Sequence, residues 1–222
     1  MCSASDNQPL SPLPANLEHS AKSQISCQTS WLESLRSRGL LQDMSSEEAL
    51  SKLPSGSKFY IGFDPTAKSL QLGNLVPLIV SIHLARAGFK PIILFGGATG
   101  AIGDPSGKDK ERQLLPREEI QKNISRQMDQ VTKLFAHLGV QPDFVNNYDW
   151  TKDISILDFL RDTGKHFTVN YMIAKEVVKT RLNGNGISYT EFSYMLLQAY
   201  DFYHLHMQEN VRMQIGGSDQ WG

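Results

Sequence analysis

The chain has 222 residues, with 22 Lys and Arg against 23 Asp and Glu, and 40% of its residues are hydrophobic. This average composition supplies one sizeable core and excludes a collagen-like or wholly disordered chain. The formal net charge of −1 excludes a general attraction to nucleic acid, and no apolar run reaches the roughly 18 residues of a membrane span, so we expect no membrane contact.

The first 30 residues differ in composition from the rest of the chain. They are rich in Ser, Pro, Gln and Asn and lack apolar periodicity, so they cannot bury enough surface to offset the entropy of ordering. We expect residues 1–30 to form a flexible, disordered tail or a possible targeting segment.

From Trp31 onward the apolar residues take on regular spacing. The predicted elements, in chain order, are a helix from Trp31 that Gly39 ends, a strand at 58–63, a helix at 75–85 with Pro77 in its first turn, a strand at 91–95, a helix at 120–138, a strand at 143–145, helices at 154–163, 168–182 and 190–206, and a strand at 211–215. Strands that alternate with helices predict an α/β fold, a Rossmann-like parallel sheet with helices on both faces, in one domain at residues 31–222.

A glycine-rich loop follows the second predicted strand, at residues 96–108. It fails the GxGxxG dinucleotide pattern because Ala98 stands where the second glycine belongs. It fails the phosphate-binding P-loop pattern because of Ile102 and Asp109. The glycines still allow a ligand to approach the backbone closely, so a binding loop and a flexible surface loop both remain open.

The predicted helix at 190–206 has a polar face as well as an apolar one. Tyr194, Gln198 and Asp201 are spaced four and three residues apart, which places them on one side. Such a face is solvated in most helices. However, Tyr, Gln and Asp can also hold a small polar ligand together, and the face contains no Lys or Glu.

Four segments in order resemble the bacterial-type tyrosyl-tRNA synthetases: YIGFDPT at 60–66, GDPSGK at 103–108, FSYMLLQAYD at 192–201 and GGSDQWG at 216–222. The resemblance implies a dimeric class I synthetase with a Rossmann-like catalytic domain. Such an enzyme activates L-tyrosine with ATP to tyrosyl-adenylate and transfers the tyrosyl group to tRNA(Tyr). The resemblance implies Mg²⁺ with the ATP substrate and no protein-bound metal.

The resemblance also assigns roles to individual residues. Those that would bind tyrosine are Tyr60, Asp104, Asn147, Tyr194, Gln198, Asp201 and Gln220. Those that would line the ATP site are Asp64, Thr66, Gly73, Gly217 and Asp219. Those that would stabilise the transferring phosphates are Gln71, Asn74, Lys108 and Arg112.

Two departures from the family pattern leave other interpretations open. The signature His-x-Gly-His reads Gln71-Leu-Gly73-Asn74, and an amide carries no fraction of positive charge for a phosphate. The family's KMSKS loop and anticodon-binding region would follow Gly222, so we expect the catalytic domain to be incomplete at its C-terminus. The alternatives are a truncated, non-catalytic product that binds tyrosine or a partner subunit, and an unrelated nucleotide-binding α/β enzyme.

Two further expectations concern assembly and compartment. The segment at 143–171 carries Phe144, Trp150, Phe159, Phe167 and Tyr171, which are too many aromatic residues for a solvated surface, and we predict a homodimer interface there. A bacterial-type core behind a serine-rich extension favours the mitochondrial matrix, with the bacterial cytoplasm as the alternative.

Overall fold

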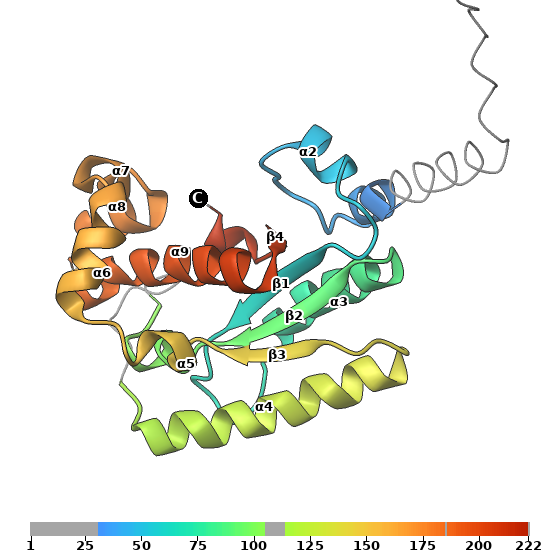
Figure 1. Ribbon diagram of the computed structural model, residues 1–222, viewed down its shortest axis with the longest axis horizontal. Helices are drawn as coiled ribbons and strands as arrows, with labels where there is room; N and C mark the ends of the chain where they lie inside the picture. The colour runs from blue at the N-terminus through green and yellow to red at the C-terminus, as the bar shows by residue number, and fades with distance from the viewer. Residues whose placement is uncertain (1–30, 105–113, 185, 222) are drawn as a thin grey trace, which may run out of the picture.

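The computed structural model describes residues 31–104, 114–184 and 186–221; the predicted tail at 1–30 lies outside them. In the described part, one sheet is formed by β1 (Lys58–Phe63), β2 (Lys90–Phe95), β3 (Asp143–Asn146) and β4 (Val211–Gln214). The strand order is β3-β2-β1-β4, and all three pairings are parallel. The predicted parallel α/β sheet is therefore confirmed (Figure 1).

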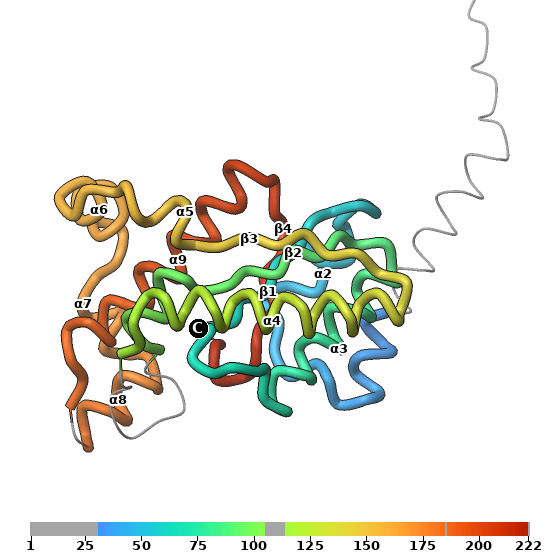
Figure 2. Tube along the Cα trace, turned by 90° about the horizontal axis from the view of Figure 1, so that it is seen from below, coloured from blue at the N-terminus to red at the C-terminus, as the bar shows by residue number. Residues whose placement is uncertain are grey.

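Helices connect the strands and cover the sheet. They are α2 (Glu47–Ser51), α3 (Leu72–Arg86), α4 (Arg117–His137), α5 (Tyr148–Thr151), α6 (Ile156–Asp162), α7 (Val169–Ile173), α8 (Glu176–Leu182) and α9 (Tyr189–Glu209), with short 3-10 turns η1 (Thr99–Ala101), η2 (Gly164–His166) and η3 (Ser218–Gln220). Figures 1 and 2 show α6, α7 and α8 grouped at one end of the molecule, with α4 running along one side of the sheet. Among the described residues, no helix is long and apolar enough to cross a membrane.

Alternation along β1 divides the core between the two faces of the sheet. Ile61 and Phe63 pack in one cluster with residues of α3 and α4, such as Ile82 and Ile124. Their neighbour Tyr60 packs on the opposite side with Leu205 of α9. Because successive strand residues point to opposite faces, this pattern confirms that helices cover both faces.

The start of α3 differs from the sequence prediction. The helix begins at Leu72, so Pro77 lies inside it and not in its first turn. The apolar pattern missed this turn because Leu72 is 83% exposed and contributes nothing to the buried stripe. Gly39 does end the first described helical segment, residues 31–37, with a φ of 66° that favours glycine.

Other helices also differ from the predicted ranges. The single helix expected at 168–182 is broken into α7 and α8 because Lys175 adopts an extended backbone, with φ −68° and ψ 137°. The short helices α2 and α5 were not predicted, and neither buries a residue fully. Periodicity cannot reveal a helix that has no buried stripe.

The strand order determines where a ligand can bind. The first three strands add successively in one direction, and the chain then crosses to the other side of β1 to form β4. In open parallel sheets, ligands bind beyond the carboxyl ends of the strands where the order reverses. That point lies beyond the ends of β1 and β4.

Candidate active site

A cavity of about 390 Å³ opens at this reversal point, lined by residues from β1, the loop after it, α3, α9 and the loop after β4. Thirteen of the residues predicted from the sequence line it: Tyr60, Asp64, Thr66, Gln71, Gly73, Asn74, Asp104, Tyr194, Gln198, Asp201, Gly217, Asp219 and Gln220. Segments as distant in sequence as 60 and 220 thus meet in one hollow.

The structure describes only one of the other three predicted residues, and that residue does not line the cavity. Asn147 is completely buried behind it and contacts the cavity residues through hydrogen bonds. Lys108 and Arg112 lie outside the described residues. The role assigned to each of the sixteen residues stays a prediction at this point, because position alone does not identify a ligand.

Helix α9 supplies one wall of the cavity. Its N-terminus is fixed by Ser188, whose Oγ accepts a hydrogen bond from the Glu191 N–H at 3.2 Å, while Glu191 Oε2 accepts from the Ser188 N–H at 3.3 Å. This reciprocal capping sets the start of the helix. Tyr194 and Asp201 are then buried on the side that faces the sheet.

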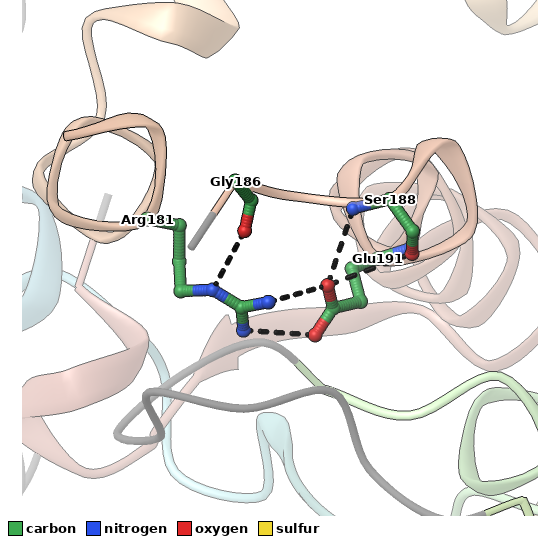
Figure 3. A network of polar contacts seen from close by, with 4 residues as sticks. All are labelled: Arg181, Gly186, Ser188 and Glu191. Atoms are coloured by element: carbon green, nitrogen blue, oxygen red, sulfur yellow. Dashed lines mark hydrogen bonds and ion pairs between the residues drawn. The ribbon is translucent and has the colours of Figure 1, made fainter. Parts of the chain in front are cut away.

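A buried ion pair anchors the same end of α9 to α8. The Arg181 guanidinium donates from Nη1 and Nη2 to the Glu191 carboxylate at 2.9 and 2.8 Å, and Nε donates to the Gly186 carbonyl at 3.1 Å (Figure 3). The two side chains are only 7% and 2% exposed. Glu191 is three residues from Tyr194, so this pair fixes the helix close to the cavity.

Asp201 and Tyr60 form the deepest part of the cavity lining, which we call the floor, and Asp201 accepts two hydrogen bonds there. Its Oδ2 accepts from Asn147 Nδ2 and its Oδ1 from Trp150 Nε1, both at 2.9 Å. Burial raises the pKa of Asp201 to about 7, against the lowering effect of these two hydrogen bonds, and the charge of Asp64 adds to the rise. The carboxyl therefore titrates near neutral pH.

The hydroxyl of Tyr60 faces the same floor. It is buried and has no hydrogen-bond partner among the described residues. Burial raises the pKa of Tyr60 far above its usual value, and the charge of Asp201 raises it further, so the phenol stays protonated. A buried hydroxyl without a partner is costly and is suited to a polar ligand atom.

A second carboxylate, Asp64, links the floor to the glycine-rich loop. It accepts from the Tyr194 hydroxyl at 3.0 Å and from Thr99 Oγ1 at 2.8 Å, and Asn147 Nδ2 donates to the same Thr99 oxygen at 3.0 Å. Burial, followed by the charges of Asp64 and Asp104, raises the pKa of Tyr194 well above its usual value. A Cβ at Gly96 would lie 2.0 Å from Asp64 Oδ1, so this close approach requires glycine.

The third carboxylate, Asp104, lies across the cavity and is bonded by an amide relay. Gln198 Nε2 donates to Gln220 Oε1 at 3.1 Å, and Gln220 Nε2 donates to Asp104 Oδ2 at 3.0 Å. With Asp64 and Asp201, this carboxylate gives the cavity an acidic lining. Such a lining favours a ligand that carries a cationic group.

The cavity therefore has two different sides. We call the buried side the inner wall, formed by Tyr60, Asp104, Tyr194 and Asp201, each at most 9% exposed. We call the other side the outer wall, whose members are exposed: Thr66, Gln71, Gly73, Gly217 and Asp219.

The outer wall includes the beginning of α3. Asn74 Oδ1 accepts from the Gln71 N–H at 2.8 Å, which caps the helix. This bond uses the Gln71 backbone and the Asn74 oxygen, so the Asn74 amide nitrogen is turned away from the cap. This end of α3 suits an anionic ligand, because the backbone N–H groups and the dipole at a helix N-terminus favour negative charge.

Two residues of this network were not singled out as site residues from the sequence. Thr99 lies within the glycine-rich loop, and its position in that loop was the only signal. Trp150 was predicted to lie in a homodimer interface, yet its indole donates to Asp201 and stacks on His204 with ring centroids 4.5 Å apart.

Comparisons with known proteins agree on one family. A family model described as tRNA synthetases class I (W and Y) matches residues 51–222. The tyrosine–tRNA ligases of Streptococcus mutans and Bacteroides thetaiotaomicron are 52% and 50% identical over 194 and 200 residues, which is 86% of this chain and 46% of each relative. The chain thus spans about half the length of the curated relatives it matches.

Solved structures give the same result. A C-terminally truncated mitochondrial tyrosyl-tRNA synthetase from Aspergillus nidulans superimposes with a TM-score of 0.79 at 28% identity, over 91% of this chain and 63% of that one. The corresponding truncated enzyme from Coccidioides posadasii gives a TM-score of 0.72 at 28% identity, over 92% of this chain and 62% of that one.

Proposed function

We propose a function from one premise: this chain belongs to the class I tRNA synthetases, in the family that contains the tryptophan and tyrosine enzymes. Within that family we propose a tyrosine–tRNA ligase, which activates L-tyrosine with ATP and transfers the tyrosyl group to tRNA(Tyr). The relatives' names support tyrosine, and the polar floor of the cavity supports it independently.

The observation that carries the proposal is the pairing of Tyr60 with Asp201 on that floor. The phenol of a bound tyrosine would donate to Asp201 and accept from the Tyr60 hydroxyl, which has no partner among the residues that the structure describes. Phenylalanine would leave the buried Tyr60 hydroxyl without a partner and would give the Asp201 carboxylate no phenol donor, which disfavours its binding. The ammonium group of tyrosine would lie against the acidic lining, near Asp104, Tyr194 and Gln198.

In the proposed reaction, the carboxylate of tyrosine attacks the α-phosphorus of ATP and pyrophosphate leaves. No protein nucleophile is needed, so this chain's residues position the substrates and stabilise phosphoryl charge. The outer wall, with Thr66 and Gln71, would hold the phosphates. Among the described residues no group of three or more His, Cys, Asp or Glu could hold a metal ion. We propose that Mg²⁺ arrives bound to the ATP phosphates, because substrate phosphates are ligands that Mg²⁺ prefers.

We also propose that the protein acts as a homodimer, on revised grounds. Two of the aromatic residues that suggested an interface point inward: Phe144 stacks on Phe95, and Trp150 bonds Asp201. The exposed apolar surface instead comes from α6 and α7, where Ile156 and Leu157 are 72% and 73% exposed. Sedimentation that shows only monomer at tens of micromolar would count against the dimer.

For the compartment we propose the mitochondrial matrix. The two solved fungal structures carry mitochondrial names, which supports this choice, whereas the curated relatives are bacterial and support the bacterial cytoplasm. Fusing residues 1–30 to a fluorescent protein tests the proposal, because import into mitochondria requires a targeting signal in that segment.

Isothermal titration of the 222-residue chain tests the tyrosine site directly. We expect L-tyrosine to bind, and L-phenylalanine and L-tryptophan to bind far more weakly. If the three amino acids bind equally, the floor does not select a phenol and the proposal is wrong.

Gln71 favours a second candidate function, a protein that binds tyrosine without activating it. Glutamine can donate to a phosphate oxygen but lacks the positive charge that strengthens such a bond. Tyrosine-dependent ATP–pyrophosphate exchange separates the two candidates. We expect tyrosine binding with exchange that Gln71 slows but does not abolish. Binding without any exchange would favour the second candidate, and vigorous exchange would eliminate it.

A further inference from the structure

Helix α4 carries two buried amide side chains in a stripe that is otherwise apolar. Residues such as Ile120, Ile124 and Phe135 pack this helix against the sheet. Asn123 and Gln127 lie in the same buried region and are only 1% and 2% exposed. An apolar residue would fill either position without the cost of burying an amide, so the contacts of these amides are informative.

The amides of α4 bind the backbone of the loop between β1 and α3. Asn123 Nδ2 donates to the Pro65 carbonyl at 3.1 Å, and Gln127 Nε2 donates to the Ala67 carbonyl at 2.9 Å. Gln130 Oε1 then accepts from the Leu70 N–H at 3.0 Å. The three side chains are spaced four and three residues apart and so share one face of the helix.

These bonds clamp the loop on both sides of Thr66. Pro65 is held by Asn123, and it directly follows Asp64, which Tyr194 and Thr99 already fix. Ala67 lies on the other side of Thr66, and the hydrogen bond from Gln127 holds its carbonyl there. Thr66 itself is exposed on the outer wall of the cavity. Its position therefore depends on the hydrogen bonds from α4 to its two neighbours in the chain.

Gln127 also reaches the cavity itself. Because the Ala67 carbonyl can only accept, the amide must present its nitrogen there, and Oε1 faces the other way. Gln127 lines the cavity beside Thr66 and Ala67, and its buried Oε1 has no partner among the described residues. A buried acceptor of this kind is rare in folded proteins and points to a functional constraint.

We propose that Gln127 is a positioning residue for the nucleotide: it holds Ala67 so that Thr66 is presented to the phosphates of ATP. The proposal rests on the proposed function, because ATP is the nucleotide it names. Gln127 acts through the loop, so its loss affects ATP and leaves the inner wall, where tyrosine would bind, unchanged.

The test compares Gln127→Leu with Gln121→Leu in the 222-residue chain. Gln121 makes the matched control because it lies on the same helix but is exposed. Hydrogen exchange is measured for the backbone amides of residues 66–71 and of β1, without ligand. Titrations then give the dissociation constants of ATP and of L-tyrosine, and circular dichroism confirms folding. Gln127→Met repeats each measurement with an unbranched side chain that is easier to accommodate.

We expect both Gln127 variants to speed exchange at residues 66–71 but not in β1. We expect them to weaken ATP binding by roughly fivefold to tenfold, as the loss of one neutral hydrogen bond implies, with tyrosine affinity unchanged. Gln121→Leu should change nothing. Unchanged exchange in a folded variant, equal losses for both ligands, or a wild-type chain that binds no ATP would overturn the proposal. Absent tyrosine binding in the wild type would instead count against the proposed function, while faster exchange would still support the clamp.

Discussion

The two walls of the cavity are built in opposite ways. The inner wall is buried, and a continuous set of hydrogen bonds joins Tyr194, Asp64, Thr99, Asn147 and Asp201. The outer wall is exposed and is formed by a loop and a helix terminus. Gln127 of α4 supports the loop through a hydrogen bond to the Ala67 carbonyl.

The difference follows from what each wall must do in the proposed reaction. Selecting tyrosine requires fixed polar groups whose lack of a partner penalises the wrong side chain, and burial enforces that penalty. Binding a triphosphate requires donors that tolerate its entry and release, and an exposed loop provides them. Specificity and phosphoryl chemistry thus occupy regions of different rigidity.

The largest expected effect comes from removing the anchor of the inner wall. Arg181→Met leaves the Glu191 carboxylate buried without its bidentate partner. Breaking a buried ion pair on one side costs about 3–5 kcal/mol, and we expect that loss in the free energy of unfolding measured with urea.

A double variant and an exposed pair make the controls for this measurement. Arg181→Met combined with Glu191→Gln removes the uncompensated charge and should recover part of the stability. Arg161→Met breaks the exposed Arg161–Asp162 pair and should change nothing measurable. If Arg181→Met is equally silent, the inner wall does not depend on this anchor.

The second-largest effect should weaken tyrosine binding but not ATP binding, which distinguishes the inner wall from the outer wall. Asp201→Ala removes the acceptor proposed for the tyrosine phenol. It also takes from Trp150 Nε1 its acceptor and leaves Asn147 Nδ2 with Thr99 alone. Loss of a charged hydrogen-bond partner should raise the tyrosine dissociation constant by about a hundredfold, while ATP binding stays the same. Titration of both ligands tests this expectation. Equal losses of affinity for tyrosine and for ATP would mean that the polar face of α9 is structural.

The same contrast between the walls explains what sequence reasoning could predict. Spacing along α9 places Tyr194, Gln198 and Asp201 on one face, because that relation is local to a helix. It could not reveal the bond from Trp150 to Asp201, since 51 residues separate them and only tertiary packing brings them together. The clamp from Gln127 to Ala67 was missed for the same reason, across 60 residues.

The fold shows the same limit. The strands β1 and β2 were predictable because they are short apolar runs that are buried on both faces of a parallel sheet. The helix break at Lys175 was not, because α7 buries only Met172 and α8 only Val178 and Arg181. Too few buried positions remain in either half for periodicity to show where one helix ends.

A smaller effect should appear in the pH dependence of tyrosine binding. Burial raises the pKa of Asp201 to about 7, and a phenol that donates to the carboxylate favours its ionised form. Affinity should therefore rise with pH and level off above the pKa, with binding about tenfold weaker at pH 6 than at pH 8. Titrations in buffers of different ionisation enthalpy should detect proton release at pH 6. Asp201→Asn should give a flat profile, and a flat wild-type profile would show that the carboxyl is already ionised at pH 6.

The smallest effect is expected on the outer wall, from Gln71→His. The hydrogen bond from the Gln71 N–H to Asn74 Oδ1 uses the Gln71 backbone, so it remains when the side chain becomes an imidazole. A protonated imidazole forms charge-assisted hydrogen bonds to phosphate, which are about twice as strong as neutral ones, so ATP should bind roughly threefold tighter at pH 6. The gain should vanish at pH 8 because the imidazole, with a pKa of about 6.5, is then neutral.

Titration of ATP at both pH values measures this gain in affinity, with L-tyrosine as the control ligand whose affinity should not change. An equal gain at both pH values would show that the imidazole charge plays no part, and a change in tyrosine affinity would show that the two walls are not independent.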